Sequence, residues 1–95
     1  MKQIKIICQN FQRKDGSGEF TKLSVGGQFL PLVLADVNKR YQVKFTKDSQ
    51  AKEPVNDGVY QVAFEDKDIW IDDRKEEPIV RIRAARVMFD KRLQK

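Results

Sequence analysis

The chain has 95 residues, of which 40% are hydrophobic and 35% are charged, and its formal net charge is +5. We expect residues 1–95 to form one domain, because two would each fall below the size of about 50 residues that most domains exceed. The chain has no His and one cysteine, Cys8, which excludes catalysis by Ser-His or Cys-His pairs, a His-ligated metal site, a thiolate metal cluster and an intrachain disulfide.

The first third of the chain alternates apolar and polar residues, which is typical of strands. Residues 4–8 predict a half-buried strand, in which Cys8 acts as a small apolar residue. Residues 14–18 contain Asp-Gly and form a turn, and residues 20–25 return as a strand. This pattern predicts a β-hairpin.

The middle of the chain is less regular. Gly26 and Gly27 break or bulge the second strand. Residues 29–34 are apolar, but Pro31 cannot donate to a ladder, so this segment is an edge strand or irregular. Residues 36–40 form one helical turn or a loop, and residues 41–45 alternate again as a strand.

The last half predicts further short strands separated by polar loops. The segments are a loop over 46–58, a strand over 59–64, a turn over 65–68, a short strand over 69–71, a charged loop over 72–77 and a long final strand over 79–89. Ala84 and Ala85 interrupt the final strand as a bulge or a close-packed corner. No convincing amphipathic helix is present. We therefore predict an all-β fold, most economically a small five-stranded antiparallel OB-like barrel with protruding hairpins.

The charge is distributed unevenly. Residues 1–47 carry nine basic and three acidic side chains, and residues 78–95 carry six basic and one acidic. Residues 65–77 carry three basic and seven acidic side chains. If the two basic ends meet, they form one basic face, which favours nucleic acid as the partner. The alternative is a set of solvated polar faces.

The first predicted hairpin interleaves two aromatic residues, Phe11 and Phe20, with the basic residues Arg13, Lys14 and Lys22. Aromatic rings that stack on bases and cations that follow phosphates are how proteins bind single-stranded nucleic acid. The alternative is that the two Phe rings form a cross-strand core pair.

Two later features are also candidates for binding. Arg81 and Arg83 point to the same side of a strand, where they repel unless an anion lies across them, either a phosphate or the acidic loop. Arg86 follows them. Trp70 lies between Asp68 and Asp72, where it either covers the open end of a barrel or meets a basic surface of a neighbouring subunit. Catalysis is not expected, because the carboxylates cluster in turns and no glycine segment has the context of a phosphate cradle.

The order of these features resembles the filamentous-phage (inovirus) single-stranded-DNA-binding proteins of the gene V product type. The likeness is clearest over residues 41–88, in the stretches YQVKF, DGVYQV and VRIR. It implies an oligonucleotide-binding β-barrel that forms a homodimer and coats single-stranded viral DNA cooperatively during replication. It also implies DNA contacts by Arg13, Lys14, Phe20 and Lys22, by Arg81 or Arg83 and by an exposed aromatic at Trp70. Departures from the family are Pro31, a longer acidic loop at 72–77 and a basic tail at 91–95.

The predicted function is therefore sequence-nonspecific binding of single-stranded DNA, without a cofactor, metal or small-molecule substrate. Two alternatives stay open: a small β-barrel adaptor of a mobile element that binds an acidic protein, and an RNA-binding barrel that represses translation. We expect no signal peptide in residues 1–9, because their apolar stretch is short, and no apolar run approaches the roughly 20 residues of a membrane span. We expect a cytoplasmic protein, in the host cell if a phage encodes it.

Overall fold

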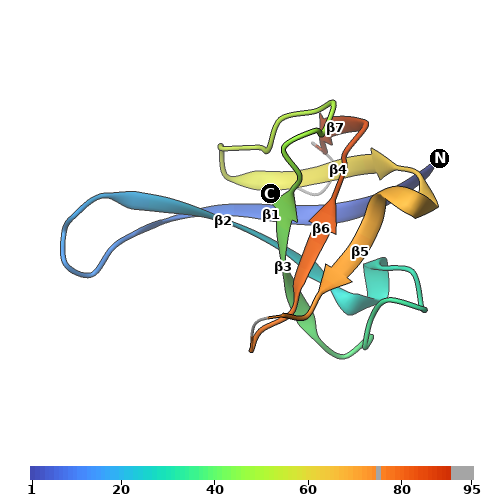
Figure 1. Cartoon of the computed structure of the whole chain (residues 1–95). Helices are drawn as coiled ribbons and strands as arrows, with labels where there is room; N and C mark the ends of the chain where they lie inside the picture. Colours follow the sequence, from blue (N-terminus) through green and yellow to red (C-terminus); the bar gives the residue numbers. More distant parts are fainter. Residues whose placement is uncertain (75, 91–95) are drawn as a thin grey trace.

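The computed structural model of the chain describes residues 1–74 and 76–90; the basic tail at 91–95 lies outside the described residues. Its strands are β1 (Lys2–Gln12), β2 (Glu19–Gly26), β3 (Arg40–Phe45), β4 (Gly58–Phe64), β5 (Ile69–Asp72), β6 (Ile79–Ile82) and β7 (Arg86–Phe89), with two 3-10 turns, η1 (Gly27–Phe29) and η2 (Asp66–Asp68) (Figure 1). The all-β prediction is confirmed. In the part of the chain described, no helix is both long and apolar enough to cross a membrane.

The strands form one mixed sheet of seven strands in the order β5-β6-β3-β2-β1-β4-β7. Five of its ladders are antiparallel, and β3 pairs with β6 in parallel. The predicted sheet had five antiparallel strands, so both the strand count and one pairing differ. In sheet order β5 and β7 lie at the two edges.

The predicted long final strand divides into β6 and β7 because the chain bends at Ala84. Ala84 is fully buried, and its carbonyl accepts the N–H groups of Gln50 and Ala51 at 2.8 and 3.2 Å. Its own N–H donates to the Ser49 hydroxyl at 3.1 Å. These bonds replace ladder bonds and let the chain leave β3 and pair with β4. The close-packed corner considered for this position is therefore present.

The hairpin of β1 and β2 projects from the rest of the protein (Figure 1). Its register runs from the pair Ile7–Ser24 to the pair Gln12–Glu19. The turn is closed by the Arg13 N–H, which donates to the Gly18 carbonyl at 2.9 Å. Gly18 has a φ of 135°, a conformation that residues with a Cβ rarely adopt.

The core consists of inward-facing residues from most of the strands. Ile4, Ile6 and Cys8 of β1 are buried, as their alternation predicts. Val80 and Ile82 of β6 are also buried, and so are alternate residues of β2, β3 and β4. The Cys8 thiol lies 3.4 Å from the Pro54 carbonyl, and burial raises its pKa, so this residue fills space in the core as expected.

The segment between β2 and β3 is irregular rather than an edge strand. Gly27 makes the tightest approach: a Cβ there would lie 2.0 Å from the carbonyl oxygen of Asp36. The Gly27 N–H donates to the Lys39 carbonyl at 2.7 Å, and the Lys39 N–H donates to the Asp36 carbonyl at 3.0 Å. The base of this loop is thereby closed, while Leu32 at its tip is 81% exposed.

Candidate nucleic-acid interface

One side of the sheet carries most of the predicted binding residues. Side chains alternate along a strand and directly paired residues share a side, so the residues opposite to the core form a single surface. We call part of this surface the outer face; this part comprises Lys5, Ile7, Gln9 and Phe11 of β1, Phe20, Lys22, Ser24 and Gly26 of β2, Arg40, Gln42 and Lys44 of β3, Val59 of β4, Trp70 and Asp72 of β5, and Arg81 of β6.

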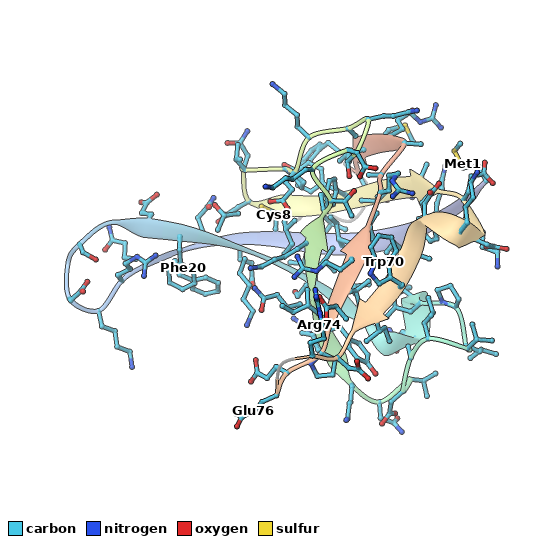
Figure 2. All side chains as sticks on the ribbon, viewed as in Figure 1. Met1, Cys8, Phe20, Trp70, Arg74 and Glu76 are labelled. Atoms are coloured by element: carbon cyan, nitrogen blue, oxygen red, sulfur yellow. The ribbon has the colours of Figure 1, made fainter. Side chains whose placement is uncertain are left out.

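The hairpin part of the outer face displays a stacked aromatic pair. Phe11 and Phe20 lie opposite each other in the ladder, with ring centroids 5.5 Å apart and planes inclined by 26°. Each residue is 40% exposed. The cross-strand pair considered from the sequence is therefore present, but it lies on the surface and not in the core. Figure 2 shows Phe20 on the hairpin, away from the body of the protein.

Cations lie next to this pair, and the neighbouring acid points to the other side of the strand. The guanidinium carbon of Arg13 lies 5.5 Å from the centroid of the Phe20 ring. Lys22 shares the Phe20 side of β2, whereas Glu19 alternates onto the other side. Among the described residues, no carboxylate lies within ion-pair distance of Arg13, Lys14 or Lys22. Along β2 the cation Lys22 therefore lies on the side of the rings and Glu19 on the other side, and Arg13 contacts the Phe20 ring.

Arg81 and Arg83 differ from the hairpin cations because both have carboxylate partners. The Nε of Arg81 lies 3.3 Å from Oδ2 of Asp72. The Nε of Arg83 donates to Asp48 at 2.7 Å, and its Nη1 donates to Asp68 at 3.0 Å. Of the two anions considered from the sequence, phosphate and acidic side chains, the second balances both arginines in the free protein.

These ion pairs keep the carboxylates charged. Hydrogen bonds from the Arg74 side chain are the main cause that lowers the pKa of Asp72 well below its usual range. The pKa of Asp48 is lowered chiefly by the hydroxyl of Thr46, with Arg83 as a further cause. Asp48 is exposed, so its ion pair orients Arg83 more than it stabilises the fold, whereas the Asp72 side chain is only 10% exposed.

Trp70 lies beside these pairs and is 37% exposed. It is paired with Arg81 across the β5–β6 ladder, and the guanidinium carbon of Arg83 lies 6.0 Å from its ring centroid. Its acidic neighbours, Asp68 and Asp72, each contact an arginine. The charge around the indole is therefore largely balanced.

Sequence reasoning missed Lys44, which lies between the two predicted groups. Its neighbour Arg81 is its direct ladder partner, and the Ser24–Gln42 pair places Lys44 on the side of Lys22. Lys44 is exposed, and no described carboxylate is within ion-pair distance. The alternation along residues 41–45 predicts that Lys44 lies on the polar side of its strand. Only the strand order shows that Lys44 lies between the hairpin and β6.

Asn10 was also missed, and it holds the base of the hairpin. Its backbone N–H and its Nδ2 both donate to Oδ1 of Asp57, at 2.8 and 2.9 Å. Nδ2 also donates to the Val55 carbonyl at 2.8 Å, and the Thr21 hydroxyl donates to the Asn10 Oδ1. These bonds fix the hairpin to the loop before β4. No local sequence signal indicates them, because Asp57 is 47 residues away.

The outer face therefore carries exposed aromatic rings, cations without carboxylate partners and polar side chains between them. Within residues 1–74 and 76–90, no group of three or more Cys, Asp or Glu side chains is placed to hold a metal ion. No protein-family model, curated protein or solved structure matches the chain.

Proposed function

We propose that this protein binds single-stranded DNA without sequence preference and coats it during the replication of a phage or mobile element. The observation that carries the proposal is the hairpin, which displays the exposed Phe11–Phe20 stack together with the basic residues Arg13, Lys14 and Lys22. Exposed rings on which bases stack, next to cations that follow the phosphates, are the features with which proteins bind single-stranded nucleic acid.

The mechanism combines two forces. Cations displace counterions from the phosphates, so affinity falls as salt rises. Bases stack on the Phe rings, which any base can do because each has a π-face. Lys22, Lys44 and Arg81 lie in adjacent strands, so they offer a strand of DNA a charged path across the sheet. No catalytic step is part of this function.

The proposed architecture is an OB-like barrel of five strands. In it, β4 with β5 forms one bent strand, and β6 with β7 forms another. Two ladders support this arrangement, since β4 pairs with β7 and β5 pairs with β6, both antiparallel. If β4 and β5 count as one strand, and β6 and β7 as another, every strand has at least two neighbours. The parallel contact of β3 with β6 then closes the sheet.

We also propose that the protein is a cytoplasmic homodimer, as its resemblance to the gene V product type implies. The apolar segment 29–34 supplies one candidate surface. Leu32 and Val33 are 81% and 91% exposed there, whereas Leu30 is buried and belongs to the core. The hairpin at 65–77 is the other candidate.

The test is a competition experiment that follows Trp70 fluorescence. The protein is titrated with oligo-dT, and duplex DNA and oligo-rU of equal length are then added as competitors. Single-stranded DNA-binding predicts a tight complex with oligo-dT that duplex displaces poorly. Preference for oligo-rU would favour RNA as the ligand. No binding at moderate salt would remove the proposal and leave an adaptor for an acidic protein.

A further inference from the structure

A second part of the outer face, next to η1, combines the same chemistry as the hairpin. Two surface pockets meet there at Arg40. One, of about 310 Å³, we call the polar pocket because most of its lining residues are polar or charged, among them Lys22, Ser24, Lys39, Arg40, Gln42 and Glu77. The other, of about 290 Å³, is more apolar and is lined by Lys5, Ile7, Gly26, Phe29, Arg40 and Val59 among others. The polar pocket begins at Lys22, where the hairpin joins the body.

The apolar pocket has an aromatic wall. Phe29 is 41% exposed, and its ring rests over Gly26, where a Cβ would lie 3.6 Å from Phe29 Cδ2. The ammonium of Lys5 lies 5.7 Å from the centroid of that ring. Ile7 and Val59 are ladder partners and form an aliphatic floor. A flat apolar group fits between this floor and the ring.

The rim of the pocket is cationic. Arg40 lies opposite Gly26 in the β2–β3 ladder, so no side chain of β2 covers it. Among the described residues, Lys5, Lys39 and Arg40 have no carboxylate within ion-pair distance. Glu77 is the acidic residue among the lining of the two pockets. An anion next to the flat group is therefore favoured.

The loop that carries these residues is held in place. The bonds of Gly27 to Lys39 and of Lys39 to Asp36 tie η1 to the start of β3. Because Gly27 has no Cβ, the two backbones can approach that closely. Phe29 and Arg40 are therefore presented at a fixed separation, which lowers the cost of ordering them on a ligand.

We propose that the apolar pocket binds one nucleobase of the single strand, stacked on Phe29, while Lys5 and Arg40 bind the adjacent phosphates. The strand then runs from the hairpin through the polar pocket to Phe29. This inference rests on the proposed function and adds a second stacking site to it. We assign a nucleotide as the occupant because, in a nucleic-acid strand, a flat base is flanked by a phosphate on each side, which matches the aromatic wall and the cationic rim of the pocket.

The variants Phe29→Ala and Arg40→Gln test the pocket, with Val55→Ala and Lys52→Gln as matched controls. Val55 and Lys52 lie in the loop before β4, both are exposed, and neither lines these two pockets. Phe29→Ala should weaken binding of oligo-dT about 5- to 150-fold with the salt slope unchanged. Arg40→Gln should lower the salt slope by about 0.7, the value for one phosphate of a single strand. The controls should bind like the parent protein.

A second readout locates the base directly. Oligo-dT that carries 5-iododeoxyuridine should crosslink to Phe29 on irradiation, as mapped by mass spectrometry of the peptides. If Phe20→Ala loses affinity but Phe29→Ala and Arg40→Gln bind like the parent and no crosslink forms at Phe29, the pocket inference is wrong and the function stands. If the parent binds no oligo-dT, both fail. If Phe29→Ala changes the oligomeric state measured by sedimentation without DNA, while its affinity for oligo-dT per protomer is unchanged, the pocket inference is wrong. The pocket would then be a contact between protein subunits.

Discussion

Replacing Phe20 with alanine tests whether the exposed aromatic pair of the hairpin binds bases. The ring stacks on Phe11 at 5.5 Å and is 40% exposed, so the folded protein loses one cross-strand pair. That loss costs about 1 kcal/mol of stability. The complex loses a stacking platform worth about 1–3 kcal/mol, which weakens binding about 5- to 150-fold. No charge is removed, so the slope of log affinity against log salt should not change.

The assay is a titration with oligo-dT at several salt concentrations, followed by Trp70 fluorescence. Phe89→Ala is the matched control. Phe89 is 46% exposed and forms an aromatic pair with Tyr60 at the same centroid distance, 5.5 Å, but on β7. It should lose similar stability and no affinity. Equal affinities for Phe20→Ala, Phe89→Ala and the parent protein, with all three folded, would refute the stacking role of the hairpin.

Three further predictions follow from the contacts. Lys44→Gln should lower the slope of log affinity against log salt by about 0.7. Arg83→Gln should lower that slope less, because Asp48 already contacts Arg83. Equal slopes for the two variants would contradict this prediction. Asn10→Ala should lower the free energy of unfolding in urea by about 1–3 kcal/mol, because its Asp57 partner is left without the amide; an unchanged urea midpoint would show that these bonds do not brace the hairpin. Stability should be constant between about pH 5 and 8, since the chain has no His, and should fall as pH drops below the ordinary carboxyl pKa of 3.8. Asp48 has a lowered pKa, so its contribution is present above that value and is lost as the pH approaches the pKa of the folded state; a melting temperature that declines already between pH 7 and 5 would contradict this.

The strands could be predicted because burial on one side leaves a period of two in the sequence. The alternation of Ile4, Ile6 and Cys8 and of Tyr60, Val62 and Phe64 matches their burial. Periodicity cannot show where a strand changes partner, because an apolar alternation can continue while the neighbouring strand changes. The division between β6 and β7 depends on bonds from the distant loop residues Gln50 and Ala51.

In the candidate site, contacts between residues close in sequence could be predicted, and contacts between distant residues could not. The hairpin with Phe11 and Phe20 could be predicted, because a turn and its flanking strands are close in sequence. The contact of Arg83 with Asp48 could not be predicted, since Asp48 is 35 residues away. Phe29 was assigned to an apolar segment, and only the close contact of Gly27 with the start of β3 brings its ring beside Lys5.

The most direct test of the central claim is an NMR titration of the isotopically labelled protein with oligo-dT. Binding along the outer face predicts amide shifts in the β1–β2 hairpin, in β3 and around Trp70, with β7 and its edge unchanged. Shifts that are absent at moderate salt, or that are confined to β7 and the 46–57 loop, would contradict the account.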